Sequence, residues 1–147
     1  MNNAEDAPPL TIRRTFNATR ERVFAAFTTP TALRAWFGPP GTSVGDVEFD
    51  PSPGGRYRIL MRTAGDEYYL SGVISDIVPP ERLAYTFRWE EDAPELERDT
   101  YVRIEFVARG DQTEVILIHG NLAGDENRAR HNRGWTESFN KLEPLLR

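Results

Sequence analysis

The sequence contains no cysteine, so this chain can form neither a disulfide nor a thiolate metal site. Only two histidines are present, His119 and His131, and we expect no metal site and no cofactor. No apolar run is long enough to span a bilayer, and the opening residues MNNAEDAPPL lack the basic and apolar regions of a secretory signal. Together these absences predict a cytoplasmic protein with no membrane partner.

Positive charge and familiar enzyme motifs are also scarce. The chain carries 18 basic and 23 acidic residues, a formal net charge of -5, and its pI is about 5.1. This balance argues against nucleic acid as a partner, because phosphate binding needs a basic face. The sequence has no phosphate loop, dinucleotide fingerprint, zinc-protease helix or nucleophile elbow. It therefore carries no signature of those enzyme classes.

The bulk composition fits one globular domain. The chain has 147 residues, of which 39% are hydrophobic and 28% are charged, close to the values of ordinary globular proteins. A chain of this length buries roughly 70% of the surface of its unfolded form, which allows a substantial core. We predict a single domain over residues 10–147, preceded by a flexible N-terminal tail over residues 1–9.

Hydrophobic periodicity predicts a mixed α+β architecture. Residues 10–16 alternate as a first strand, and two short helices follow, up to the breaker at residues 38–41. Six further strands with short links then occupy residues 47–119, which favours an antiparallel meander. A helix from about Asp125 to the C-terminus is long enough to cover one face of the sheet.

On a helical wheel this terminal helix has one inward stripe, made of His131, Trp135, Ser138, Phe139, Leu142, Leu145 and Leu146. Gly134 lies at the edge of the stripe, although glycine costs a helix about 0.5–1 kcal/mol relative to alanine. We predict that Gly134 lets the backbone approach the sheet locally while Trp135 holds the rest of the helix away, which leaves a wedge-shaped cavity. The alternative is that Gly134 only accommodates packing and that no cavity exists.

Six short motifs, in register, resemble the bacterial branch of the family named for the activator of heat-shock protein 90 ATPase. They are residues 14–18, Thr29-Pro30 with Leu33, residues 35–39, residues 53–57, Gly72 ahead of residues 79–83, and Gly134-Trp135. That family belongs to the SRPBCC superfamily, also called START-like or Bet v-like. The resemblance runs from about Leu10 to the C-terminus. It implies a helix-grip fold, in which an antiparallel seven-stranded sheet wraps around a long C-terminal helix and two short helices follow strand 1.

The resemblance also implies where function resides. Superfamily relatives bind lipids, sterols, hormones or polyketides between helix and sheet, and a few are polyketide aromatases or cyclases. The sequence departs from its relatives at Pro144, which interrupts a helix that usually continues. Because proline inside a helix costs about 3 kcal/mol, we expect a kink or an end near Glu143, and the far end of any cavity is in doubt.

We predict that the chain binds a small hydrophobic or aromatic molecule in such a cavity and performs no catalysis. Aromatic walls with a few polar tips are what a small-molecule pocket needs. The predicted ligand contacts are Trp36, Tyr57, Met61, Tyr85, His119, His131 and Trp135. The alternative for these side chains is an ordinary core role, and a histidine on an apolar face is often simply hydrogen-bonded.

Two other functions and one partner stay open. An enzyme of the aromatase, cyclase or hydrolase type would need a proton-transfer pair, for which His119 with a tyrosine is the visible candidate. The family name suggests a co-chaperone-like ATPase activator, although the named proteins use an additional N-terminal domain. Ile116 and Ile118 should face outward, which favours a homodimer through the outer sheet face; scattered surface apolarity is the alternative.

Overall fold

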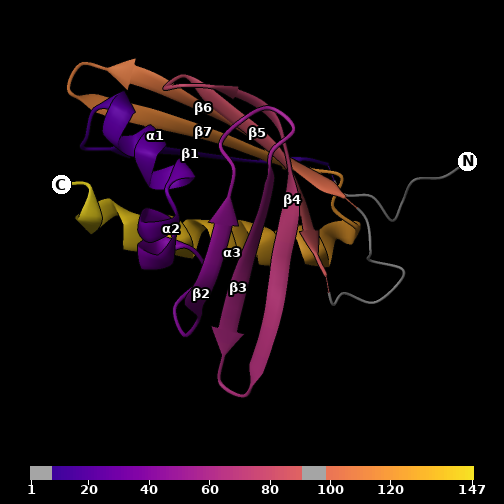
Figure 1. Cartoon of the computed structure of the whole chain (residues 1–147). Helices are drawn as coiled ribbons and strands as arrows, with labels where there is room; N and C mark the ends of the chain where they lie inside the picture. The colour runs from indigo at the N-terminus through magenta and orange to yellow at the C-terminus, as the bar shows by residue number, and fades with distance from the viewer. Residues whose placement is uncertain (1–7, 91–98) are drawn as a thin grey trace, which may run out of the picture.

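The chain folds in the element order that its periodicity predicts (Figure 1). The computed structural model describes residues 8–90 and 99–147, so residues 1–7 of the expected tail lie outside the described part. Strand β1 (Leu10–Phe16) leads into the short helices α1 (Arg20–Thr28) and α2 (Pro30–Trp36). The remaining elements are β2 (Ser43–Phe49), β3 (Arg56–Thr63), β4 (Asp66–Val78), β5 (Arg82–Trp89), β6 (Thr100–Arg109), β7 (Gln112–Gly120) and α3 (Gly124–Leu145).

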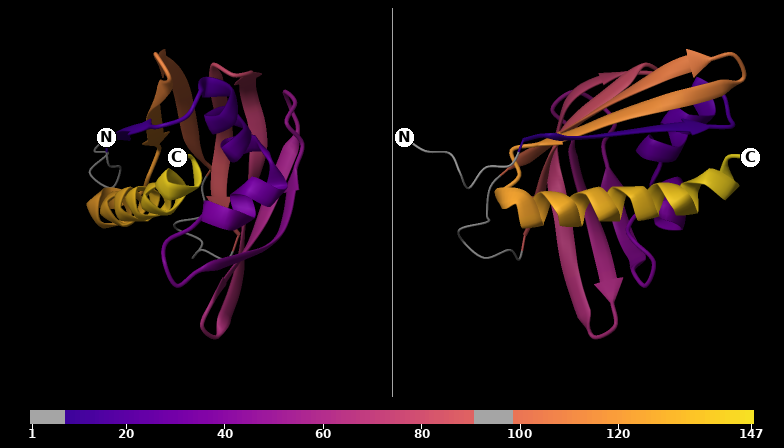
Figure 2. Two further views of the ribbon diagram at one scale, coloured as in Figure 1. Left: turned by 90° about the vertical axis from the view of Figure 1, so that its left-hand side faces the viewer. Right: turned by 180° about the vertical axis from the view of Figure 1, so that it is seen from behind.

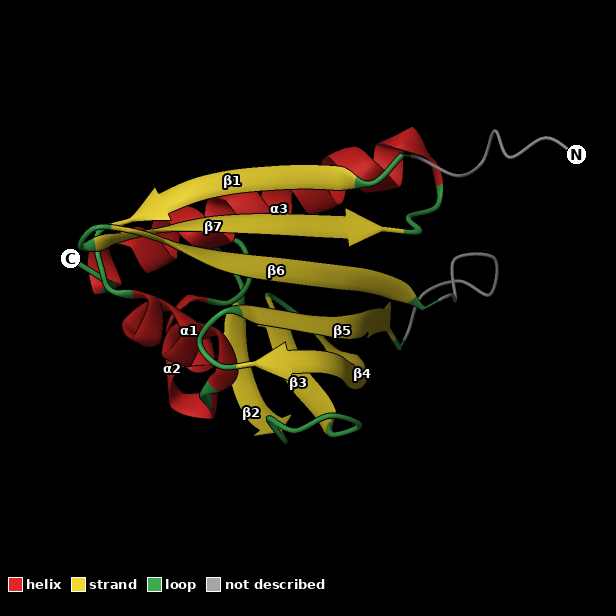
Figure 3. Cartoon of the chain, turned by 90° about the horizontal axis from the view of Figure 1, so that it is seen from above, coloured by secondary structure: helices red, strands yellow, loops and turns green. Residues whose placement is uncertain are grey.

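All of these strands form one antiparallel sheet in the order β1-β7-β6-β5-β4-β3-β2, which Figure 3 shows from above. From β2 to β7 each strand pairs with the next one along the chain, as in an antiparallel meander. Strand β1 instead pairs with β7, from Leu10 opposite His119 to Phe16 opposite Thr113. The predicted α+β helix-grip fold, with a seven-stranded antiparallel sheet and two short helices after strand 1, is confirmed.

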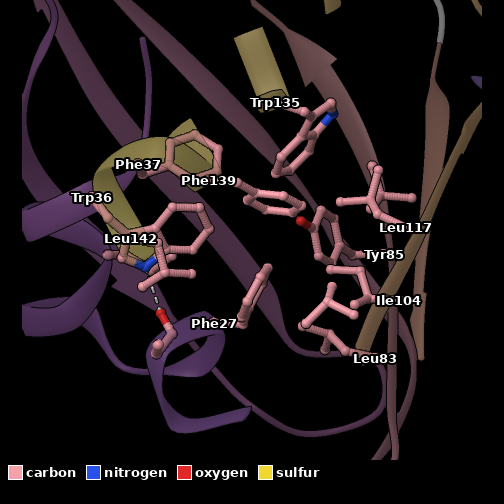
Figure 4. Close-up of a cluster of buried hydrophobic side chains, with 14 of the residues drawn as sticks. Phe27, Trp36, Phe37, Leu83, Tyr85, Ile104, Leu117, Trp135, Phe139 and Leu142 are labelled. Atoms are coloured by element: carbon pink, nitrogen blue, oxygen red, sulfur yellow. Dashed lines mark hydrogen bonds between the residues drawn. The ribbon is translucent and has the colours of Figure 1, made fainter. Parts of the chain in front are cut away.

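The sheet curls around α3, and α1 and α2 lie at the end where the C-terminus emerges (Figure 2). The C-terminal half of α3 is anchored in the core, where Phe139 and Leu142 are fully buried. The ring of Phe139 packs edge-on against Phe16 and Phe27, with centroid distances of 5.6 and 5.9 Å. Figure 4 shows the rings of Phe27, Trp36 and Phe139 gathered in this cluster. This half of the helix is therefore fixed by aromatic packing.

The terminal helix ends close to where its proline predicts. The last helical residue is Leu145, one residue beyond Pro144, and the Leu146 amide donates to the Glu143 carbonyl oxygen. Leu145 was expected on the buried stripe but is 52% exposed, whereas Leu146 is buried. On the wheel, Leu145 lies about 80° from Trp135, at the edge of the stripe, whereas Leu146 lies only about 20° from it, so Leu146 points into the core and Leu145 does not.

Gly72 of β4 leaves room for the side chain of Tyr57 of β3, which passes over β4 and reaches β5. The two residues face each other in the β3–β4 register, and the Tyr57 hydroxyl donates to the carbonyl oxygen of Thr86 on β5, at 2.6 Å. A Cβ at position 72 would overlap the Thr86 carbonyl and lie 2.7 Å from the Tyr57 ring. Glycine is therefore required here by space, because the tyrosine occupies the volume of the missing side chain.

On the outer face of β7, Ile116 and Ile118 are half-buried. A homodimer through these two residues stays a prediction, and light scattering at high protein concentration tests it. A species of twice the monomer mass supports the dimer, and a monomer at all concentrations removes it.

We predict that Gly72→Ala destabilises the fold by about 2–3 kcal/mol, because the added methyl group overpacks a site that the Thr86 carbonyl and the Tyr57 ring already fill. Urea denaturation measures the free energy of unfolding. The neighbouring Val73→Ala is the matched control, because the Val73 side chain is partly exposed on the opposite face and its truncation should cost less than about 1 kcal/mol. Equal effects of the two substitutions would contradict the assigned role of Gly72.

Candidate functional site

A cavity of about 640 Å³ lies between the N-terminal half of α3 and the inner face of β3, β4 and β5. Its sheet wall consists of Met61, Tyr68, Phe87 and Trp89, and its helix wall of Arg130, His131, Gly134, Trp135 and Ser138. Phe37, Gly38 and Pro39 close one end, and Asp66 and Glu67 of the β3–β4 turn border it as well. Because Asp66, Glu67 and Arg130 are exposed, we take these three charged residues as the mouth of the cavity.

Gly134 widens the cavity, which corrects the expectation that it brings the helix closer to the sheet. A Cβ at this position would have no atom within 4 Å outside its own helix. The prediction that the backbone approaches the sheet at Gly134 is therefore wrong. Because Gly134 itself lines the cavity, its missing side chain leaves space for other atoms there.

An indole–imidazole hydrogen bond links the sheet and the helix across the cavity wall. Trp89 Nε1 donates to His131 Nε2 at 3.0 Å, and His131 Nδ1 lies 2.8 Å from the Asn127 carbonyl oxygen, one turn earlier in α3. Since a carbonyl accepts only, Nδ1 carries the hydrogen and Nε2 accepts. The imidazole of His131 is thus fixed in orientation, with both nitrogens bonded within the protein.

A second indole–imidazole hydrogen bond is more deeply buried in the protein. Trp135 Nε1 donates to His119 Nδ1 at 3.0 Å, and His119 Nε2 lies 2.8 Å from Thr100 Oγ1. The Thr100 hydroxyl donates to the Phe87 carbonyl oxygen at 2.7 Å, so it must accept from His119 Nε2–H. Burial, helped by the nearby His131, lowers the pKa of His119 to about 3. His119 therefore stays neutral and fully bonded near neutral pH, where it is not a proton-transfer group.

The end wall of the cavity is tied to α3 by a lysine. Lys141 Nζ donates to the Gly38 carbonyl oxygen at 2.9 Å, which holds the segment after α2 against the helix. Burial lowers the pKa of this ammonium group. Phe37 adds to the same wall, with its ring edge-on to Trp135 at 5.8 Å between centroids.

Of the sequence-predicted contacts, Met61, His131 and Trp135 line the cavity. The other four, Trp36, Tyr57, Tyr85 and His119, lie outside its lining. Trp36 is buried and donates through Nε1 to the Ala26 carbonyl oxygen at 2.8 Å, and Figure 4 shows it with Tyr85 among the core side chains. Trp36, Tyr57 and Tyr85 border a separate void of about 10 Å³, which holds one water molecule at most.

Several lining residues were not among the sequence-predicted contacts, chiefly Tyr68, Trp89, Gly134 and Ser138. Tyr68 could have been found, because it lies directly opposite Met61 in the β3–β4 register and points to the same face. Gly134 and Ser138 are one helical turn apart, which places them together on the wheel. What the sequence pattern lacks is the position of each residue along the length of the helix relative to the sheet.

Comparison with protein families matches residues 17–147 to the model of the Activator of Hsp90 ATPase homolog 1-like proteins. The chain belongs to this family. A comparison with curated proteins found no match. Among solved structures, a Chromobacterium violaceum protein is similar, with 25% identity and a TM-score of 0.87 over 95% of this chain and 96% of that one. The AHSA1 protein from Silicibacter pomeroyi has 29% identity and a TM-score of 0.82 over 94% and 96%.

Membership of the Activator of Hsp90 ATPase homolog 1-like family agrees with a fold of the ligand-binding START-like type. Within residues 8–90 and 99–147, no helix is long and apolar enough to cross a membrane. In the same described residues, no group of three or more histidine or acidic side chains is arranged to hold a metal ion.

We predict that His119 makes folding stability pH-dependent. Its pKa is about 3 in the fold and about 6.5 when unfolded, so the unfolded chain binds the extra proton and stability falls as the pH falls below about 6.5. Between pH 7 and pH 5, wild-type protein should lose about 2 kcal/mol more than His119→Gln. Urea denaturation at both pH values measures the difference.

The control for this prediction is His131→Gln, which should retain the His119 contribution. Equal losses in wild-type protein and in His119→Gln would show that His119 titrates similarly in the folded and unfolded states, contrary to its bonded, neutral form.

Proposed function

We propose that this protein is a binding module that holds a small hydrophobic or aromatic molecule in the cavity between the sheet and α3. The observation that carries the proposal is the cavity itself, which measures about 640 Å³ and lies between aromatic side chains. Small-molecule sites usually measure about 300–1,000 Å³ and have mostly apolar walls. The space therefore fits a guest of a few fused or linked rings.

The shape of the lining supports an aromatic guest. Trp89 packs edge-on against Tyr68 and Phe87, with ring centroids 5.4 Å away in both cases. Phe87 also contacts the Trp135 ring at 6.0 Å. These contacts fix the rings at angles to one another, so a guest meets a rigid aromatic surface with little side-chain entropy to lose on binding.

Catalysis lacks a comparable observation. The histidine that the enzyme hypothesis depends on, His119, is buried, bonded at both nitrogens and lies outside the cavity lining. Burial raises the pKa of Tyr85 and that of Tyr57 well above the usual value of a tyrosine. A pair of such groups does not exchange protons readily near neutral pH. Binding without chemistry is the function that this geometry supports best.

The proposal predicts that Gly134→Leu strongly weakens guest binding without unfolding the protein. The leucine side chain would enter open space and occupy the cavity, and leucine favours a helix over glycine by about 0.5–1 kcal/mol. Titration with the neutral fluorescent probe N-phenyl-1-naphthylamine measures binding. We expect at least about tenfold weaker binding in this variant, since a filled site excludes the rings.

The matched control is Thr136→Leu, which adds the same side chain to the exposed face of α3. It should bind the probe as wild-type protein does. If the probe fails to bind wild-type protein, or binds Gly134→Leu equally well, the cavity is not a binding site. Trp135→Ala is less informative, because it would also leave His119 Nδ1 without its donor.

A further inference from the structure

The indole and imidazole N–H hydrogens on the inner wall of the cavity are committed to the protein itself. The indole N–H groups of Trp89 and Trp135 donate to His131 and His119. The remaining N–H of His131 points to the Asn127 carbonyl oxygen. A guest that needs to accept strong hydrogen bonds therefore competes with bonds that already exist.

Ser138, in contrast, can accept a hydrogen bond from a guest. It is buried, lines the cavity, and its hydroxyl donates to the Gly134 carbonyl oxygen at 2.8 Å. This bond uses the single hydroxyl hydrogen and leaves oxygen lone pairs that can accept from a guest. Tyr68 adds a phenol hydroxyl that can donate or accept one further bond. The interior thus favours a guest that donates.

The charged residues of the lining stand at the exposed mouth. Glu67 accepts from Arg62 at 2.8 Å, and Arg130 donates to the Asn127 side chain at 2.7 Å. Asp66 and Glu67 bring two negative charges to this rim, of which that of Glu67 is paired with Arg62, and Arg130 brings one positive charge. In the interior of the cavity, among the aromatic rings, the described lining residues include no lysine or arginine side chain. An anionic guest would have no partner there, and burying an unpaired anion is strongly disfavoured.

From this division we infer that the guest is an uncharged aromatic molecule that donates a hydrogen bond to Ser138 Oγ, and that aromatic acids of the same size are rejected. The inference rests on the proposed function and adds its ligand class. A phenol or an aromatic N–H compound meets the requirement, because each combines a ring with one donor.

Three naphthalenes of similar size test this ligand class at pH 7. Neutral 2-naphthol carries a donor, neutral 2-methoxynaphthalene carries none, and 2-naphthoate is an anion. Isothermal titration calorimetry should show that 2-naphthol binds wild-type protein about threefold to tenfold more tightly than 2-methoxynaphthalene. It should bind at least about tenfold more tightly than 2-naphthoate, whose charge loses its water on burial.

The variant Ser138→Ala locates the acceptor. It should remove the advantage of 2-naphthol over 2-methoxynaphthalene while leaving the affinity for 2-methoxynaphthalene unchanged, which isolates the hydrogen bond as in a double-mutant cycle. Thr136→Ala, on the exposed face of α3, is the matched control and should change neither affinity. Thermal unfolding of both variants verifies that they are folded.

Each outcome bears on a different claim. If 2-naphthoate binds as tightly as 2-naphthol and Arg130→Gln abolishes that binding, the guest is an acid held at the mouth and the ligand class is wrong. An undiminished preference for 2-naphthol in Ser138→Ala would also overturn it. If none of the three compounds binds wild-type protein, the proposed function itself fails, together with the inference that rests on it.

Discussion

Two indole–imidazole hydrogen bonds hold the N-terminal half of α3 at a fixed distance from the sheet, and the cavity depends on them. Trp89 from the sheet reaches His131 on the helix, while Trp135 from the helix reaches His119 on the sheet. The pairs are reciprocal, so each surface supplies one donor and one acceptor. Because all four partners are large and bonded, they act as spacers, and the helix cannot settle onto β3–β5 without breaking buried hydrogen bonds.

The two halves of α3 consequently have different roles. Around Phe139 and Leu142 the helix is anchored by aromatic packing, and this half determines its direction. Around Gly134 the helix borders open space, at a cost in helix propensity of about 0.5–1 kcal/mol. A glycine that weakens its helix and leaves open space beside the backbone is what the proposed binding role requires, because stability is exchanged there for room.

The sequence predicted the fold well and the site only partly. The alternation of apolar and polar residues, together with the turn residues, was enough to predict the strands. The helical wheel correctly identified Trp135, Ser138 and Phe139 as buried. The alternation of residues along a strand predicts which face of the sheet a side chain lies on, but not where on that face it lies. Tyr57 and Tyr85 were therefore expected in the cavity, although they lie on the same face beyond its end. Their place near α2 depends on long-range contacts, such as the fit of Tyr57 over Gly72, that no local pattern encodes.

The central claim is that a guest sits between the aromatic wall of the sheet and the bare backbone at Gly134. Nuclear Overhauser effects between bound 2-naphthol and assigned protein protons test it most directly. The account predicts cross-peaks from the naphthol ring to both the Gly134 α-protons and the Trp89 indole ring, on opposite sides of one guest. Cross-peaks to exposed residues alone, with neither of these two partners involved, would contradict it.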